Sequence, residues 1–419
     1  EVLNRVIEKA FRGSAPAQVN VPRDYWTHVI DIELPPIIRF ERQGGGKEAI
    51  DKAAKLLSDA KFPVILSGAG VVIGDAIEDC KKLAEKLDAP VCNGYQHNDS
   101  FPGSHLLAVG PLGYNGSKAA MELISKADVV LALGTRLNPF STLPGYGIDY
   151  WPKEATIIQV DVNPDRIGLT KKVTVGICGD AKMVAQQLLE KLSPNAGDSG
   201  RVNRKNLIHQ TKSSWLQNLT SLDHEDDDPG TVWNKEARER DSDRMSPRQA
   251  WRAIQVGMPD DVIISSDIGN NCAIGNAYPT FEKGRKYLAP GLFGPCGYGF
   301  PSILGAKIGC PEIPVIGFAG DGAFGISMNE MSSCARKEWP AITMVIFRNY
   351  QWGAEKRNSI LWFDDNFVGT ELDPELSYAK VANSCGLKGI TVKTMEETTK
   401  TIKQSCEDQK QGITTFIEV

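Results

Sequence analysis

The stretch that decides the fold runs from Ile313 to Gly353 and reads IPVIGFAGDGAFGISMNEMSSCARKEWPAITMVIFRNYQWG. It contains an apolar run, a glycine-rich turn at Ala319–Ala323, a helical segment and a second apolar run. Short apolar runs are typical of strands buried in a parallel sheet. Strand, helix and strand in this order form a right-handed crossover unit. We therefore expect Asp321 and Asn349 to leave two parallel strands at the same edge of a sheet.

The residues at that edge predict a metal and phosphate site. Asp321 offers a carboxylate and Asn349 an amide oxygen, and Mg²⁺ prefers such oxygen ligands together with waters and substrate phosphates. Gly320 and Gly322 allow the backbone to approach a phosphate closely. An ordinary strand-to-helix turn would use the same glycines. The asparagine, placed after a full helix and a second strand, favours a diphosphate carried on Mg²⁺.

Composition limits the class of protein. A chain of 419 residues predicts two or three domains. A net charge of −5 gives no nucleic-acid footprint, and no apolar run reaches the roughly 18–20 residues of a membrane helix. The nine cysteines include no CxxC pair, which fits reduced thiols in the cytoplasm better than disulfides or a zinc site. The sequence indicates a cytoplasmic protein with no nucleic-acid or membrane partner.

The order of patterns predicts an α/β fold with doubly wound parallel sheets. Residues 1–46 read as a helix, a short strand at Val19–Val21 and an extended connector, which is too little for a domain. Residues 47–193 alternate helix and strand and predict a Rossmann-like domain. Residues 194–245 are polar, and we expect a solvated linker with some helix around Val202–Leu219. Residues 246–419 form the final domain.

Four further local patterns refine this reading. Gly68, Gly70 and Gly74 follow the first strand, but their GxGxxxG spacing favours a tight turn over a bound dinucleotide. Ser246 and Gln249 predict a capping box at the start of the final domain. Within the stretch 313–353, the pairing of Ser327 with Glu330 predicts a second capping box, so we expect the crossover helix to begin there. The acidic run at 225–228 is read as solvated linker.

Gly320-Asp321-Gly322, followed by Asn349, resembles the fingerprint of the thiamine-diphosphate enzymes. The resemblance implies that Asp321, Asn349 and the backbone carbonyl of Gln351 hold Mg²⁺. The usual form has two consecutive asparagines, whereas this chain has Arg348-Asn349, and the liganding asparagine matches. The resemblance also implies the domain order: the tail of a pyrimidine-binding domain, a central domain and a diphosphate-binding domain. The chain then reads as a fragment, with the activating glutamate on an upstream domain and the catalytic residues unknown.

The same resemblance implies two further cofactor loops. One follows the strand at Val262–Ser265, and the other is the glycine-rich segment Gly291–Pro301, for which a packing turn is the alternative. In many relatives a larger apolar residue stands at the position of Cys296. The implied cofactor-binding residues are Asp267, Gly269, Asn270, Gly294, Cys296, Gly320, Gly322, Ala323, Asn349 and Gly353.

Two stretches narrow the resemblance to the sulfoacetaldehyde acetyltransferases. They are Gly134–Phe140 together with Asp149–Pro152, and Asn349–Lys356. This resemblance implies conversion of sulfoacetaldehyde and phosphate to acetyl phosphate and sulfite in taurine degradation, by a homodimer or homotetramer. It also implies a central domain without flavin, and we expect the isolated fragment to be inactive.

An anionic substrate requires cations near the cofactor. Lys356 and Arg357 follow the metal loop and are candidates by position, although a solvated start of the next helix would carry the same residues. Two alternatives stay open for the function. One is an acetolactate synthase-like enzyme or a 2-oxo-acid decarboxylase, whose product would be CO₂. The other is a non-catalytic subunit or fragment that only binds the cofactor.

Overall fold

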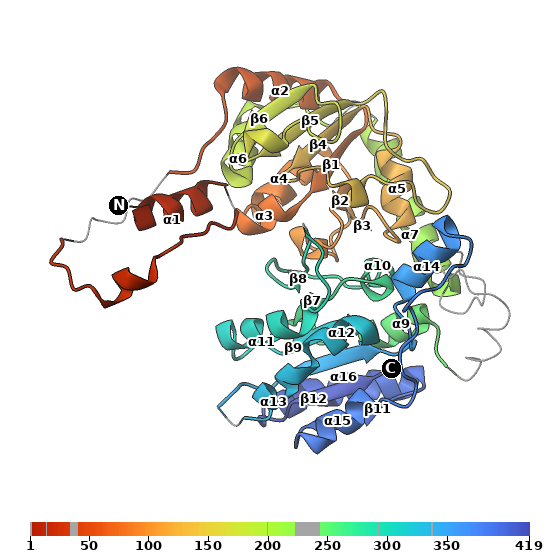
Figure 1. Ribbon diagram of the computed structural model, residues 1–419. Coiled ribbons are helices and arrows are strands. Elements are labelled where there is room, and N and C mark those ends of the chain that lie inside the picture. Colours follow the sequence, from red (N-terminus) through yellow and green to blue (C-terminus); the bar gives the residue numbers. More distant parts are fainter. Residues whose placement is uncertain are drawn as a thin grey trace.

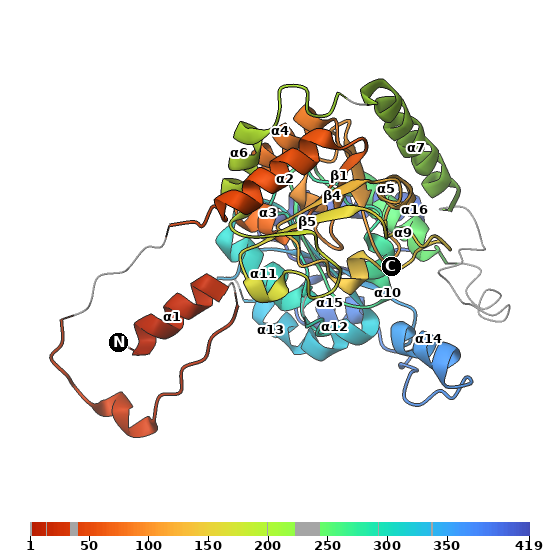
Figure 2. The same ribbon diagram turned by 90° about the horizontal axis from the view of Figure 1, so that it is seen from above.

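The computed structural model describes residues 2–13, 15–33, 41–198, 200–222, 244–291, 293–336 and 338–419. They form two stacked α/β bodies, and the N-terminal helix α1 (Val2–Gly13) lies on an arm apart from both (Figures 1 and 2). Each body is built on a six-stranded sheet in which all neighbouring strands are parallel. The predicted α/β fold with doubly wound parallel sheets is confirmed.

The first body has the strand order β3-β2-β1-β4-β5-β6. Its strands are β1 (Pro63–Ser67), β2 (Val91–Asn93), β3 (Ala108–Pro111), β4 (Val129–Leu133), β5 (Thr156–Asp161) and β6 (Val175–Cys178). Its helices are α2 (Lys47–Asp59), α3 (Ala69–Ile73), α4 (Ile77–Leu87), α5 (Lys118–Ile124) and α6 (Ala181–Lys191). Every residue of β1 and β4 is buried, because helices cover both faces of a parallel sheet.

The second body has the strand order β11-β12-β10-β9-β7-β8. Its strands are β7 (Ile263–Ser266), β8 (Tyr287–Leu288), β9 (Val315–Gly320), β10 (Thr343–Phe347), β11 (Lys388–Thr391) and β12 (Thr415–Glu418). Its helices are α9 (Pro247–Gly257), α10 (Asn270–Gly275), α11 (Gly299–Gly309), α12 (Asp321–Ser327), α13 (Met331–Cys334), α14 (Gly353–Trp362), α15 (Tyr378–Ser384) and α16 (Met395–Gln409).

Alternating side chains of the second sheet pack in two separate hydrophobic cores, one on each face of the sheet. On one face, Ile316 and Val345 pack with Trp251 of α9 in one buried cluster. On the other face, Met344 packs with Phe300 of α11 in a second cluster. Successive side chains of a strand point to opposite faces, so burial on both faces requires a continuous apolar run. This requirement explains why β9 and β10 can be recognised in the sequence.

Two helix starts differ in how they match the sequence. The capping box of Ser246 and Gln249 opens α9, as predicted. The capping box expected at Ser327 is wrong, because α12 begins at Asp321, directly after β9, and Ser327 is its last residue. The glycine-rich turn is therefore itself helical, and Asp321 stands in the first turn, where a carboxylate suits the positive end of the helix.

The helix expected around Val202–Leu219 is α7 (Arg201–Leu222), and some of its side chains are buried against both bodies. Ile208 belongs to the core of the first body, whereas Trp215 belongs to a core of the second. The Arg204 side chain is buried. It donates hydrogen bonds to the backbone carbonyls of Lys61, Leu87 and Asp88 at 2.7, 2.9 and 2.9 Å. The acidic run at 225–228 lies outside the described residues, and the boundaries 47–193, 194–245 and 246–419 stay predictions.

Buried polar contacts join the two bodies beside α10. The Asn98 amide donates to the carbonyl oxygens of Asn276 and Pro279 at 2.9 and 2.8 Å. The Asp99 carboxylate accepts hydrogen bonds from the backbone amides of Lys286 and Tyr287, at β8. Each bond satisfies a buried polar group. The first body therefore fixes the position of α10, whose N-terminal loop is part of the site described below.

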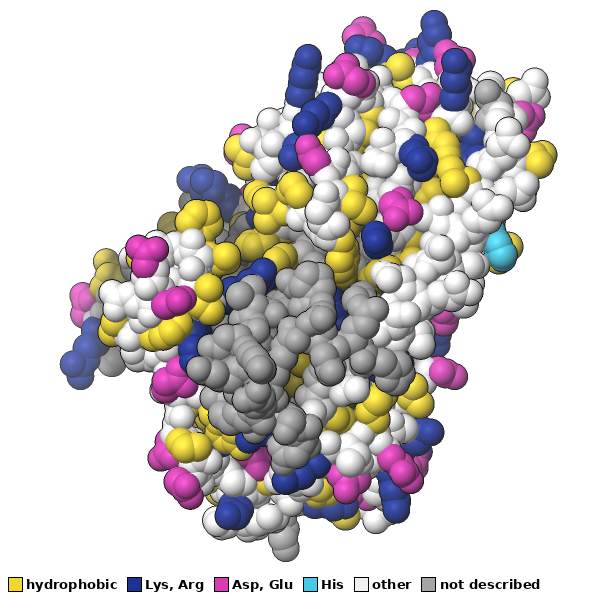
Figure 3. Space-filling view, turned by 90° about the vertical axis from the view of Figure 1, so that its right-hand side faces the viewer, with side chains coloured by type: hydrophobic (Ala, Val, Ile, Leu, Met, Phe, Trp, Pro, Cys, Tyr) yellow, Lys and Arg dark blue, Asp and Glu magenta, His cyan; other side chains and the backbone are white. Residues whose placement is uncertain are grey.

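Other sequence expectations have mixed outcomes. The strand expected at Val19–Val21 is wrong: these residues are irregular and lie on the arm apart from both sheets, where they have no strand to pair with. All nine cysteines are free thiols. In the described chain, no helix is both long and apolar enough to span a membrane. On the face seen in Figure 3, the described acidic and basic side chains are interspersed over both bodies.

Candidate functional site

The candidate site lies at the carboxyl ends of β7, β9 and β10, where loops follow β7 and β10 and α12 follows β9 directly. These strands are neighbours in the second sheet. From β7 the chain passes to β8 on one side and then to β9 on the other, so the strand order reverses between β7 and β9. In open α/β sheets such a switch point opens a crevice in which ligands bind. The crossover unit predicted from 313–353 therefore lies at the position that the fold reserves for a ligand.

Asp321 is the central charged group of this crevice. Its side chain is 1% exposed. Oδ1 accepts a hydrogen bond from the backbone amide of Gly322 at 3.0 Å, and Oδ2 accepts one from Tyr350 at 2.7 Å. Burial raises the pKa of Asp321, while these amides and the charge of Arg348 act against that rise. A buried carboxylate is costly unless it is paired with a cation.

Three potential metal ligands lie close together: the Asp321 carboxylate, the Asn349 side-chain amide and the Gln351 backbone carbonyl. The amide atom that Asn349 directs into the site lies 3.1 Å from Asp321 Oδ1 and 2.9 Å from the backbone oxygen of Gln351. Two arrangements suit these distances: an amide nitrogen donating to both oxygens, or an amide oxygen sharing a cation with them. Octahedral Mg²⁺ with ligands at 2.0–2.1 Å places adjacent oxygens about 2.9 Å apart. The donor set fits Mg²⁺, with one carboxylate, one amide and one carbonyl.

The backbone of the metal loop has an uncommon conformation. Tyr350 has φ +59°, in the left-handed region that residues other than glycine seldom adopt. A neighbouring segment holds the loop on both sides of Gln351. The amide of Trp352 donates to the carbonyl of Thr370 at 2.8 Å, and the amide of Leu372 donates to the carbonyl of Tyr350 at 2.8 Å. These bonds fix the peptide that presents the Gln351 carbonyl.

Two glycines of the site are required by close contacts. A Cβ at Gly322 would lie 2.8 Å from the Trp352 indole. A Cβ at Gly353 would lie 2.7 Å from the side-chain nitrogen of Asn349 and 3.2 Å from that of Asn270. Gly353 therefore brings the loops after β7 and β10 together. Among the other expected cofactor-binding residues, Gly320 ends β9 and Ala323 lies buried in the first turn of α12.

Asp267 has a structural role that its residue type did not reveal. Its side chain is fully buried. Oδ1 accepts hydrogen bonds from the amides of Ile268 and Gly297 at 2.8 and 3.1 Å, and Oδ2 accepts one from Gly299 at 2.8 Å. Burial raises its pKa, and these amide bonds oppose the rise. The carboxylate thus ties the glycine-rich loop 293–299 to the end of β7 and fixes the position of that loop at the crevice.

The loops after β7 and before α11 contain three more of the expected cofactor-binding residues. Gly269 and Gly294 have φ +129° and +67°, backbone conformations that glycine adopts much more readily than other residues. Cys296 is exposed within the glycine-rich loop. Asn271 was not expected as a site residue: its side-chain nitrogen is buried without a hydrogen-bond partner in the described chain. Its oxygen lies 3.7 Å from the position of a Cβ on Gly320, so the unpartnered amide lies between two site loops. The adjacent asparagines in Gly269-Asn270-Asn271 were the available signal.

The two candidate cations lie on α14 but have different surroundings. The Lys356 ammonium pairs with Glu371 at 2.5 Å. Arg357 donates a hydrogen bond to the Tyr114 hydroxyl of the first body, and its guanidinium lies 5.5 Å from the Tyr114 ring centroid. The Nε atom of Arg357 is buried without a hydrogen-bond partner among the described residues. Arg357 therefore retains a free donor, whereas the charge of Lys356 is already balanced.

Comparisons with known proteins agree with this geometry. Residues 50–188 match the model of the thiamine pyrophosphate enzyme central domain, and residues 267–419 match that of the C-terminal TPP binding domain. A probable sulfoacetaldehyde acetyltransferase of Rhizobium meliloti is 76% identical over the whole chain and 71% of its own length. The chain belongs to the sulfoacetaldehyde acetyltransferase family of thiamine pyrophosphate enzymes.

A second member of the family and a more distant relative agree with this assignment. A sulfoacetaldehyde acetyltransferase of Roseovarius nubinhibens is 71% identical over the whole chain and 69% of its own length. A probable acetolactate synthase large subunit of Methanocaldococcus jannaschii is 29% identical over 93% of this chain and 64% of its own length. The resemblance found in the sequence is therefore confirmed, and thiamine diphosphate is the cofactor of the matched domain.

The position of Asp321 gives a direct prediction. Asp321→Asn keeps the size of the side chain but removes the only carboxylate of the three donors. We expect binding of thiamine diphosphate with Mg²⁺ to weaken by about tenfold or more, while the thermal unfolding temperature changes little. Fluorescence titration of the complete natural protein, with and without a chelator, measures this effect. The exposed Asp373→Asn serves as the matched control, and unchanged affinity in Asp321→Asn would contradict the assignment.

Proposed function

We propose that this chain provides the diphosphate-binding and central domains of an enzyme that converts sulfoacetaldehyde and phosphate to acetyl phosphate and sulfite. The observation that carries the proposal is the convergence of Asp321, Asn349 and the Gln351 carbonyl at the switch point of the second sheet. It is supported by identities of 66–76% over essentially the whole chain with three proteins of the sulfoacetaldehyde acetyltransferase family.

Each site residue has a proposed task. Asp321, Asn349 and the Gln351 carbonyl hold Mg²⁺, which carries the diphosphate of the cofactor. The backbone around the site glycines admits the diphosphate, and Asn271 directs an unpartnered amide toward it. Bound thiamine diphosphate supplies the carbanion chemistry at the aldehyde carbon. The full proposed set is Asp267, Gly269, Asn270, Asn271, Gly294, Cys296, Gly320, Gly322, Ala323, Asn349 and Gly353.

The proposed reaction balances without an external oxidant or reductant. The C–S bond of sulfoacetaldehyde breaks and sulfite leaves with the bonding electron pair. The aldehyde carbon loses its hydrogen as a proton and reaches the acyl level, while the neighbouring carbon takes up a proton and becomes a methyl group. A phosphate oxygen then forms a bond to the acyl carbon. Both the sulfonate and the phosphate are anions, so the reaction requires a cation that the protein places near the reacting end of the cofactor.

Arg357 is the stronger candidate for that cation. Residues four apart share a helix face, so Arg357 lies on the same side of α14 as Gly353, which abuts the Asn349 amide. Its buried Nε has no hydrogen-bond partner among the described residues. Lys356 has Glu371 as a partner. We therefore propose Arg357 as the main anion ligand and assign Lys356 a smaller contribution.

Several expectations about the whole protein remain proposals. We propose a cytoplasmic homodimer or homotetramer that acts on small molecules and needs neither nucleic acid nor a membrane. The chain spans about 70% of the length of its relatives. We propose that a domain of the enzyme other than the central and diphosphate-binding domains supplies the glutamate that activates the cofactor, and that the central domain carries no flavin. An acetolactate synthase-like activity is the alternative, because those relatives also match most of the chain.

Product analysis separates the two activities. The complete natural protein, incubated with thiamine diphosphate, Mg²⁺, sulfoacetaldehyde and phosphate, is expected to form acetyl phosphate and sulfite in equal amounts. Phosphate consumption and sulfite release are measured in parallel, with pyruvate as the comparison substrate. Release of CO₂ from pyruvate at a higher specificity constant than sulfite from sulfoacetaldehyde would contradict the proposed function and favour the alternative.

The two cations give a graded prediction. Arg357→Ala removes a hydrogen bond to a charged group, roughly 1.5–3 kcal/mol, and should lower the specificity constants for sulfoacetaldehyde or phosphate about ten- to a hundredfold. Lys356→Ala should have a smaller effect, because Glu371 already balances that charge. Steady-state rates against both substrates test this order, with the exposed Asn358→Ala as a control on the same helix. Wild-type constants in both cation variants would place the anion site elsewhere.

A further inference from the structure

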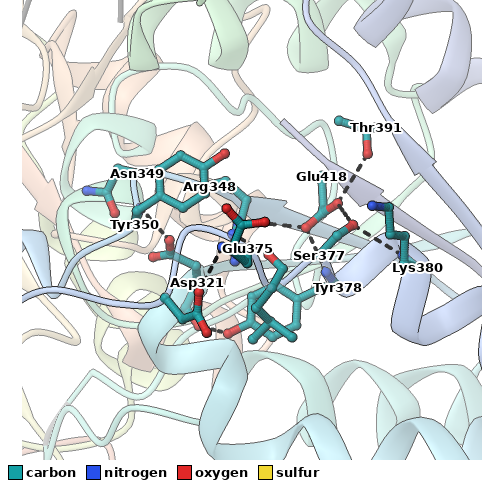
Figure 4. A network of polar contacts seen from close by, with 12 residues as sticks. Asp321, Arg348, Asn349, Tyr350, Glu375, Ser377, Tyr378, Lys380, Thr391 and Glu418 are labelled. Carbon is teal, nitrogen blue, oxygen red and sulfur yellow. Dashed lines mark hydrogen bonds and ion pairs between the residues drawn. The ribbon is translucent and has the colours of Figure 1, made fainter. Parts of the chain in front are cut away.

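A buried ion pair lies directly behind the metal loop. The side chains of Arg348 and Glu418 are 8% and 5% exposed, and Arg348 Nε lies 3.7 Å from Glu418 Oε1 (Figure 4). Glu418 ends β12, which pairs with β10, and the backbone amide of Arg348 donates to the carbonyl of Val419 at 3.0 Å. The pair therefore couples the last residues of β12 to the residue that precedes Asn349.

Both partners of the pair are further satisfied. The Glu418 carboxylate accepts hydrogen bonds from Ser377 Oγ at 2.6 Å, the Tyr378 amide at 2.7 Å and Thr391 Oγ1 at 3.1 Å. The Arg348 guanidinium also donates to the carbonyl of Leu376. The charges thus have a fixed geometry, which is the condition under which a buried ion pair is retained without a large penalty.

The guanidinium contacts the rings of two tyrosines that each donate a hydrogen bond to Asp321. It lies 4.4 Å from the centroid of Tyr350 and 5.2 Å from that of Tyr378. The Tyr350 amide donates to Asp321 Oδ2, and the Tyr378 hydroxyl donates to the Asp321 carbonyl at 2.9 Å. Figure 4 shows these groups, from the start of α12, the loop after β10 and the start of α15, gathered around Arg348. A single side chain therefore touches both residues that fix the backbone and carboxylate of Asp321.

The conformation of the loop explains what such a contact can do. Tyr350 has a positive φ, a backbone conformation that is unfavourable for residues other than glycine and persists only where the surroundings hold it. Stacking of the guanidinium on the Tyr350 ring favours that conformation. It also fixes the residues on both sides of Asn349, because Arg348 precedes it and Tyr350 follows it. The direction of the Asn349 amide and of the Gln351 carbonyl depends on these two neighbours.

We propose that Arg348 and Glu418 are positioning residues for the metal site: their buried pair, stacked on Tyr350, holds Asn349 and the Gln351 carbonyl in the arrangement that accepts the cation. This inference depends on the proposed function, because it concerns the same Mg²⁺ and thiamine diphosphate. Arg348 stands where the usual family form has the first of two asparagines.

A double-variant cycle tests the pair. The variants are Arg348→Gln, Glu418→Gln and the combination, made in the complete natural protein. The first measurement is the Kd of Mn²⁺ at saturating thiamine diphosphate, from the electron paramagnetic resonance signal of free Mn²⁺. We expect each single variant to raise this Kd about tenfold or more. We expect the combination to raise it no more than the larger single change, since both variants remove the same contact.

A second measurement separates positioning from stability. Thermal unfolding without ligands is recorded for the same variants, and the combined variant leaves no unpaired buried charge that would prevent folding. The matched control is Asp408→Asn, which breaks the pair between Lys388 and Asp408, 2.5 Å apart in the same domain. We expect this control to lower the unfolding temperature while the Kd of Mn²⁺ stays at the wild-type value.

The outcomes are distinct. A folded Glu418→Gln variant with the wild-type Kd for Mn²⁺ would overturn the inference, as would effects of the two single variants that add in the combination. An equal loss of Mn²⁺ affinity in the Asp408→Asn control would also overturn it, because the effect would then follow stability alone. Wild-type protein whose Mn²⁺ binding does not depend on thiamine diphosphate would instead contradict the proposed function itself.

Discussion

The burial of the Asp321 carboxylate at the end of β9 is the constraint on which the rest of the site depends. A carboxylate held away from water needs hydrogen bonds and a cation. The amides of Gly322 and Tyr350 supply two of the hydrogen bonds, and the oxygens of Asn349 and Gln351 complete a set of donors that a divalent cation can share. The uncommon backbone of Tyr350 and the close contact at Gly353 both follow from the need to bring these oxygens to Asp321.

The two bodies support this arrangement from different directions. The second sheet sets the spacing of β7, β9 and β10, and its two cores lock the strands from both faces. The first body holds α10 through Asn98 and meets α14 through the contact of Tyr114 with Arg357. α7 packs on both bodies. The geometry of the loops is therefore a property of the whole chain, although the donors themselves come from one crossover unit.

The crossover unit and the converging residues could be predicted because strand periodicity and fixed topology determine them. Asp321 and Asn349 had to leave the same sheet edge once both strands were recognised. Other features depend on tertiary contacts that a sequence does not display. The Asp267 carboxylate accepts hydrogen bonds from loop amides. Ser327 ends a helix that it was expected to begin. Side chains of α7 pack on both bodies, although polar residues suggested a solvated linker. The unpartnered amide of Asn271 and the pair of Arg348 with Glu418 become evident only when distant segments are brought together.

The position of the metal is the most direct test of this account. Crystals of the complete natural protein, grown with thiamine diphosphate and Mn²⁺, allow the metal to be located from its anomalous scattering. The account predicts one peak within about 2.2 Å of oxygens from Asp321, Asn349 and the Gln351 backbone, with the diphosphate on the same ion. A peak at another place, or a bound diphosphate whose metal does not contact these three oxygens, would contradict it.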